Sequence, residues 1–215
     1  MKFIGVYNYT VILTYLSLVS GLLGIKSAFD GKLGLAIICL VTSGICDLFD
    51  GTVARTKKNR TEDEKNFGIQ LDSLCDVICF GAFPAIWLYF MGVDSKVGIA
   101  SLIFYVLCAV IRLAFFNVIE AKRQKTEGGS TKYFRGLPVT SASIIFPFFY
   151  LVSLLINWNG MSIVFHILPL LTGILFITDF RVPKFNVGSV VNKLFAKKTK
   201  EVEEEVCLEK EYISK

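Results

Sequence analysis

Long apolar stretches are the feature that most restricts what this chain can fold into. Six of them lie at about residues 7–26, 33–55, 68–92, 97–119, 136–157 and 161–179. Each is close to the roughly twenty residues that a helix needs to cross the hydrocarbon core of a bilayer. Hydrophobic residues make up 53% of the chain and its mean hydropathy is +0.59, which is far more apolar than an ordinary soluble domain. The sequence therefore predicts an all-α integral membrane protein with about six transmembrane helices.

Basic residues are unequally distributed between the loops that separate these stretches. The loops after the second and fourth stretches carry most of them: Lys57, Lys58, Arg60, Lys65, Lys122, Arg123, Lys125, Lys132 and Arg135. The opposite loops carry only Lys26, Lys32 and Lys96. Because basic loops stay in the cytoplasm, both termini are predicted to be cytosolic. The net charge of +5 then fits anionic lipid headgroups better than nucleic acid.

The predicted membrane domain covers residues 1–183. Its first apolar stretch is expected to be a retained span and not a signal peptide, because polar residues interrupt it and no small-residue cleavage site follows. Beyond the domain, apolar residues recur at helical spacing beside lysines, and a highly charged run ends the sequence. This pattern predicts a cytosolic region at 184–215, made of an interfacial helix and a charged tail.

Four aspartates lie at the ends of the second and third apolar stretches: Asp47, Asp50, Asp72 and Asp76. Residues three or four apart share one face of a helix, so two facing helices would bring all four carboxylates together. Such a cluster beside lipid requires cations, and an all-oxygen site suits Mg²⁺ or Mn²⁺, with two ions expected. A single Asp pair on a helix is usually a solvated face, but two pairs at two membrane boundaries favour a metal site.

Small and basic residues accompany the aspartates. Gly51, Ala54 and Gly68 keep the inner helix faces small, which would let a phosphate-bearing ligand approach the backbone. Arg55 is placed to bind a phosphate through two hydrogen bonds. Arg112 is the one Lys or Arg well inside an apolar stretch, so we expect it either to pair with a carboxylate or to contact a phosphate or carboxylate of a substrate.

The order of these residues resembles the signature of the CDP-alcohol phosphotransferases: two aspartates, a glycine, an Ala-Arg pair, a spacer, a glycine and two more aspartates. In this chain the signature runs from Asp47 to Asp76, and the resemblance covers roughly residues 5–180. The spacer TKKNRTEDEKNF is longer than is usual in the family, which suggests an extended cytosolic loop. Within the family, the stretches FGIQLDSLCDVICFGAFPA and FRGLP are similar to those of phosphatidylserine synthases.

This resemblance implies an activity and a role for each site residue. The implied reaction transfers the phosphatidyl group of CDP-diacylglycerol to L-serine and releases CMP. The resemblance also suggests a homodimer. The distribution of basic residues, which does not depend on the family, places the Asp cluster at the cytosolic side, and we expect the membrane to be the plasma membrane. Asp76 would be the catalytic base close to metal, and the other three aspartates would be the main metal ligands.

The resemblance also implies which residues bind the two substrates. The CDP-lipid would contact Asn8, Thr10, Gly51, Ala54, Arg55 and Gly68. Asn8 and Thr10 also fit a simple helix cap. Lys132 and Arg135 would border the region that receives serine, and Arg112 is a further candidate there.

Other activities fit parts of the same pattern. A glycerol phosphate or inositol phosphate acceptor would keep the family, but the FRGLP and LDSL stretches favour serine. An intramembrane prenyltransferase also holds Mg²⁺ and diphosphate with Asp pairs, yet the compact Asp-Gly-Ala-Arg spacing is not its pattern. A cation transporter would distribute acidic residues through the depth of the membrane, whereas here they gather at one face.

Overall fold

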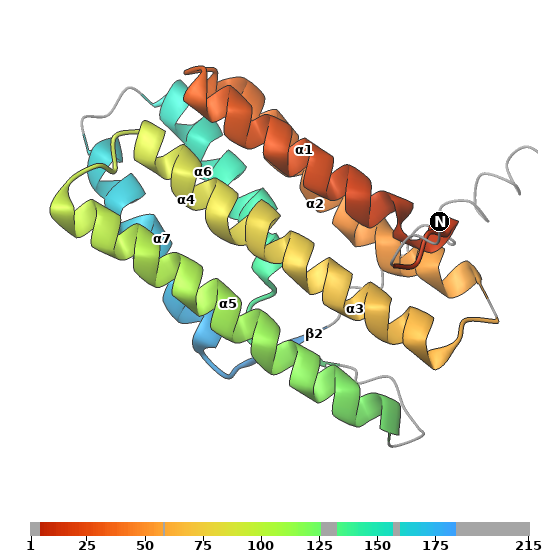
Figure 1. Cartoon of the computed structure of the whole chain (residues 1–215). Coiled ribbons are helices and arrows are strands. Elements are labelled where there is room, and N and C mark those ends of the chain that lie inside the picture. The colour runs from red at the N-terminus through yellow and green to blue at the C-terminus, as the bar shows by residue number, and fades with distance from the viewer. Residues whose placement is uncertain (1–4, 58, 126–132, 157–159, 184–215) are drawn as a thin grey trace, which may run out of the picture. The chain divides into compact units, whose positions relative to one another are not determined.

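The computed structural model describes residues 5–57, 59–125, 133–156 and 160–183 (Figure 1). The chain divides into two compact units, Met1–Val182 and Pro183–Lys215, and the first contains all the described helices. The predicted interfacial helix and charged tail at 184–215 lie outside the described residues, as does Lys132 of the predicted acceptor region.

Helices make up most of the first unit. In chain order they are η1 (Tyr9–Val11), α1 (Ile12–Phe29), α2 (Leu33–Thr56), α3 (Glu62–Asp76), η2 (Val77–Ala82), α4 (Phe83–Phe90), α5 (Lys96–Lys125), η3 (Val139–Ser141), α6 (Ala142–Leu155) and α7 (Met161–Ile177). Within the described residues, four helical segments are long and apolar enough to cross a membrane: Tyr9–Phe29, Leu33–Ala54, Glu62–Phe90 and Lys96–Ala121. Shorter apolar helices, Val139–Leu155 and Met161–Ile177, form in the last two predicted stretches. Each predicted stretch is thus helical, and the first four have the length of a full span.

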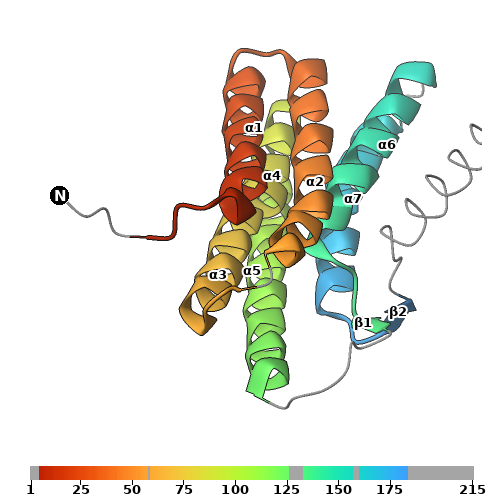
Figure 2. The same cartoon turned by 90° about the vertical axis from the view of Figure 1, so that its right-hand side faces the viewer.

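Small residues allow α1 to pack closely along α2 and along the η2–α4 segment. The buried face of α1 carries them at helical spacing: Thr14, Ser17, Gly21, Gly24, Ser27 and Ala28. Small side chains let two apolar helices approach each other in a membrane, where packing replaces the hydrophobic effect as the driving force. The hydroxyl groups of Ser17 and Ser43 lie 2.7 Å apart across this contact. Figure 2 shows the two helices side by side and joined by a tight turn at one end.

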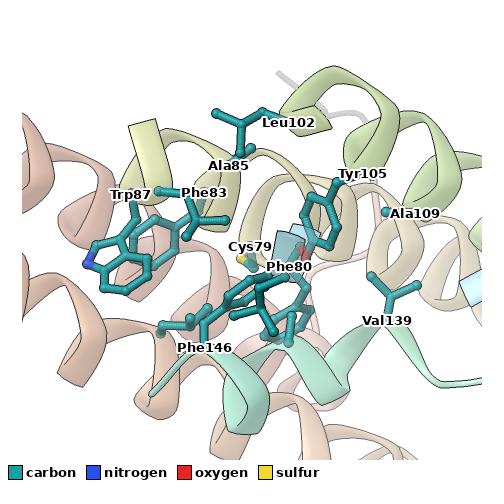
Figure 3. Packing of buried hydrophobic residues seen from close by; sticks show 14 of the residues in the cluster. Cys79, Phe80, Phe83, Ala85, Trp87, Leu102, Tyr105, Ala109, Val139 and Phe146 are labelled. Atoms are coloured by element: carbon teal, nitrogen blue, oxygen red, sulfur yellow. The ribbon is translucent and has the colours of Figure 1, made fainter. Parts of the chain in front are cut away.

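An aromatic core fills the middle of the first unit. Phe80, Phe83, Trp87, Tyr105 and Phe146 are fully buried there (Figure 3). The rings of Tyr105 and Phe146 meet edge to face, with centroids 5.6 Å apart. The indole nitrogen of Trp87 donates to the Leu33 carbonyl at 3.1 Å, so the polar edge of this ring is also satisfied.

A π-helix, η2, interrupts the long helix that carries two of the aspartates. It begins directly after Asp76, and the amide of Phe83 donates to the carbonyl of Ile78, five residues earlier. Tyr105 of α5 donates its hydroxyl to the Phe80 carbonyl within this turn at 2.5 Å. One extra residue in a turn rotates the next part of the span by about 100° relative to a regular helix. The aspartates and the aromatic core can therefore face different neighbours on one continuous span.

One short pair of strands accompanies the helices in the described part of this all-helical fold. Two short strands, β1 (Tyr133–Arg135) and β2 (Arg181–Pro183), pair with each other. Directly after β1, Gly136 has a φ of +71°, which favours glycine, and its amide donates to the Phe180 carbonyl at 2.7 Å. A Cβ at this position would lie 2.9 Å from the carbonyl oxygen of Thr178. The Arg-Gly-Leu-Pro turn is therefore held against the end of α7.

Candidate active site

Two helices bring the four aspartates together. Asp47 and Asp50 lie on α2, and Asp72 and Asp76 lie on α3. One carboxylate oxygen from each of Asp47, Asp50 and Asp72 lies within 4.8 Å of the other two. Asp76 is 8% exposed, and its carboxyl group lies next to that of Asp47. The facing pairs that the spacing predicts are therefore present in the fold.

The cluster suits a divalent cation. Its three side chains supply carboxylate oxygens, the donors that hard ions such as Mg²⁺ and Mn²⁺ prefer. Oδ1 of Asp72 is buried and has no hydrogen-bond partner among the described residues. Carboxylates this close repel one another strongly away from bulk water, and a cation removes that repulsion. The three close carboxylates, together with the buried Asp72 oxygen that has no described hydrogen-bond donor, indicate a site that could hold metal.

Thr14 of α1 also belongs to this site. Its hydroxyl donates to Oδ2 of Asp50 at 3.1 Å, and the residue is 5% exposed. Thr14 was not among the site residues predicted from the sequence. Its signal was weak, because a threonine inside an apolar helix usually bonds to its own backbone. Only the packing of α1 on α2 shows that its partner is a carboxylate.

A cavity of about 270 Å³ lies beside the cluster. Its lining comes from helices that are distant in sequence: Thr10, Val11, Thr14, Asp50, Gly51, Ala54, Arg60, Lys65, Gly68, Ile69, Asp72 and Glu120. The three small residues that were predicted to leave room for a ligand are all in this lining. Arg60 and Lys65 were not predicted as site residues. The cavity thus combines carboxylates that can hold a cation with two basic residues.

The two polar residues near the N-terminus have different positions. Asn8 caps η1: its side-chain oxygen accepts from the Thr10 amide at 3.1 Å and also from the Thr10 hydroxyl. Its amide nitrogen lies 3.5 Å from Oε1 of Glu64, to which it donates. Thr10 lines the cavity, whereas Asn8 is not among the lining residues. The capping role that the sequence suggested is therefore present, and Thr10 also reaches the site.

Glu64 joins the start of α3 to Thr61 and Lys57 by hydrogen bonds. It forms a capping box with Thr61 and accepts from Nζ of Lys57 at 2.8 Å. The connection between α2 and α3 is therefore short, at residues 57–61, and residues 62–67 of the spacer are helical. The prediction of an extended loop is wrong here, because the capping box starts the helix well before the apolar stretch begins.

The predicted acceptor residues are described only in part. Arg112 of α5 is 7% exposed, and its Nε has no hydrogen-bond partner among the described residues. Its guanidinium group lies 5.6 Å from the ring centre of Phe116, and a Cβ on Gly136 would be 3.6 Å from its Nε. No ion pair to Arg112 occurs in the described part of the chain. Arg112 thus faces the Gly-Leu-Pro turn without the carboxylate partner that was one expectation for it.

Two predicted site residues are located only by their backbone. Arg55 lies within α2, one residue before its end, and Arg135 is the last residue of β1. Their side chains lie outside the part of the chain that the structure describes.

Comparison with known proteins identifies the class of this chain. Residues 7–176 match the model of a family described as CDP-alcohol phosphatidyltransferase. The chain belongs to this family, as the spacing of the aspartates predicted. A search of the solved structures found no match.

Several curated relatives carry more specific names. An archaetidylserine synthase of Methanothermobacter thermautotrophicus is 40% identical over 141 residues, which are 65% of this chain and 56% of that protein. A CDP-diacylglycerol–serine O-phosphatidyltransferase of Methanocaldococcus jannaschii is 32% identical over 90% of this chain and 79% of its own length. A protein of the same name from Helicobacter pylori is 30% identical over 88% of this chain and 77% of its own length. The chain thus spans just over half of the first relative and more than three quarters of the other two.

Proposed function

We propose that this chain transfers the phosphatidyl group of CDP-diacylglycerol to L-serine, giving phosphatidylserine and CMP. The observation that carries the proposal is the cluster of three carboxylates beside a cavity, in a chain whose relatives are named for serine. The names of these relatives differ in the lipid part, archaetidyl or phosphatidyl, and share the serine part. Serine is therefore favoured over glycerol phosphate or inositol phosphate as the acceptor.

Asp47, Asp50 and Asp72 would hold Mg²⁺ or Mn²⁺, with two ions expected and Asp76 close to them. When bound, such ions polarise the phosphoryl group and neutralise the charge that develops on the departing CMP. Thr14 would orient Asp50 through its hydrogen bond.

The donor would lie in the cavity beside the cluster. The small side chains of Gly51, Ala54 and Gly68 leave room there for the CDP group. Thr10 would contact the donor directly, and Asn8 would support it by capping η1. Arg55 remains the proposed phosphate ligand of the signature.

We assign the catalytic base to Asp76. The serine hydroxyl must lose its proton as its oxygen attacks the lipid phosphorus and the bond from that phosphorus to CMP breaks. The single histidine of the chain, His166, lies on α7, which contributes no lining residue to the cavity. Asp76 is buried next to the carboxyl group of Asp47, which would keep it beside the metal ligands, where its carboxylate could accept this proton.

Serine would be received near Arg112, Lys132 and Arg135. The support comes from Arg112, whose buried guanidinium group faces Gly136 and pairs with no described carboxylate. A buried cation without a partner is costly, and the carboxylate of serine is a suitable one.

The active site would face the cytoplasm, where serine is available. We propose six spans in the plasma membrane, both termini in the cytosol, a membrane domain at 1–183 and a cytosolic region at 184–215. The unequal distribution of Lys and Arg supports this orientation. The start of α3, the end of α5 and the β1–β2 pair also lie at the same end of the helices, away from the α1–α2 turn (Figure 2). The homodimer implied by the resemblance stays a prediction.

The test is release of CMP from CDP-diacylglycerol by the purified chain in lipid bilayers. Release should require both serine and a divalent ion. In Asp76→Asn, donor binding should persist, because three carboxylates still hold metal, while turnover should fall by about 10² to 10⁴, the usual range for loss of a general base. Release that prefers glycerol 3-phosphate or inositol phosphate would refute the serine assignment and leave the family assignment standing. Turnover near that of the wild type in Asp76→Asn would refute the base.

A further inference from the structure

Arg60 lies in the connection between α2 and α3 and lines the cavity beside the aspartates. Its guanidinium group bridges the two helices. Nη1 donates to the Ala54 carbonyl near the end of α2 at 3.5 Å, and Nη2 donates to the Glu64 carbonyl near the start of α3 at 3.2 Å. These two contacts hold the planar group in one orientation.

The third nitrogen of this group has no hydrogen-bond partner in the described part of the chain. Nε of Arg60 is buried and makes no hydrogen bond to any described residue. Arg60 also forms no ion pair within the described part of the chain, and neither does Lys65, which lines the same cavity. A buried charged donor is costly unless it is paired, so its position at a cavity indicates that a ligand supplies the partner.

We propose that Arg60 binds the diphosphate oxygens of the CDP-linked donor. The identity of this ligand rests on the proposed function, whereas the anion site itself rests on the geometry of Arg60. A guanidinium group is planar, always charged and suited to phosphate oxygens. Arg60 is therefore a donor-binding residue that stands outside the aspartate signature, in the spacer.

Gly68 makes room for this arginine. A Cβ at position 68 would lie 2.8 Å from Nη2 of Arg60, which is closer than nonbonded atoms normally approach. The guanidinium group is the far end of a flexible side chain, so Gly68→Ala should displace it without disrupting α3. The substitution is therefore a geometric probe of the same contact.

Binding of CDP and of cytidine to the purified full chain, in detergent free of anionic lipid, tests this inference. Arg60→Gln should weaken CDP binding by about tenfold to a hundredfold, the range for a hydrogen bond to a charged group, and leave cytidine binding unchanged. Gly68→Ala should also weaken CDP binding, but much less when Arg60 is already Gln, because both changes remove one contact. Lys26→Gln is the matched control, since it removes an exposed charge in the last turn of α1, at the end of that helix away from the cavity.

Three outcomes are decisive. Equal losses of CDP and cytidine binding in Arg60→Gln would overturn the inference, because they would indicate that Arg60 only holds α2 and α3 together. Unchanged CDP binding, with an altered dependence of activity on anionic lipid, would overturn it and assign Arg60 to a headgroup phosphate. Selective loss of CDP binding in a protein that does not use serine would support the inference and refute the proposed acceptor.

Discussion

Replacing Asp50 by Asn should stabilise the protein in metal-free buffer and reduce its response to divalent ions. One carboxylate oxygen from each of Asp47, Asp50 and Asp72 lies within 4.8 Å of the other two. Two unit charges at that distance repel by about 3.5 kcal/mol at an effective dielectric constant of about 20. Asn has nearly the same shape as Asp and no charge, so the substitution removes two of the three repulsions.

The net gain is smaller than two full repulsions. One carboxyl group of the wild-type cluster can bind a proton and so relieve part of the repulsion in metal-free buffer. We therefore expect a gain of about 2 to 4 kcal/mol in the free energy of unfolding, or a rise of about 5 to 15 °C in Tm for a chain of this size. The Thr14 hydroxyl can still donate to the side-chain oxygen of Asn, so that hydrogen bond is not lost.

Thermal unfolding in EDTA and in Mn²⁺ measures both effects. The Tm of the wild type should rise when Mn²⁺ replaces EDTA, and that of Asp50→Asn should rise much less, because one ligand is missing. Asp30→Asn is the control, since Asp30 is exposed, pairs with Lys26 at 2.5 Å and lies outside the cluster. If Asp50→Asn is less stable than the wild type in EDTA and gains as much from Mn²⁺, the metal site is refuted.

Two further predictions concern the acceptor and the membrane orientation. Arg112→Gln should raise the KM for serine by about tenfold to a hundredfold and leave donor affinity unchanged, because it removes a charge-assisted contact to the serine carboxylate. Steady-state kinetics measures this change. A folded variant with an unaltered KM for serine would contradict the assignment. Single cysteines at Asn59 and Ser95, in a background without the native cysteines, should react with impermeant reagents from opposite sides of the membrane. Labelling of both from outside intact cells would contradict the six-span arrangement.

The sequence was sufficient for properties that depend on local spacing. Apolar stretches of span length predicted the helices, because the bilayer requires continuous runs of apolar residues. The spacing within each Asp pair predicted one shared face, because the helical repeat is constant. The capping box of Thr61 and Glu64 was also visible in the sequence and could have placed the start of α3 correctly.

Tertiary structure decided which residues share the site. Helical spacing specifies the face on which a side chain lies but not the residue that it meets. The bond from Thr14 to Asp50, the place of Arg60 over Gly68, and the contact between the hydroxyl of Tyr105 and the π-turn each join residues from different elements. Such contacts depend on how closely helices pack, which small residues at their interfaces determine. The sequence by itself therefore determined the apolar helices, the carboxylate pairs and the family. The basic lining of the cavity, and the lack of a carboxylate partner for Arg112 among the described residues, emerged only when distant helices were brought into contact.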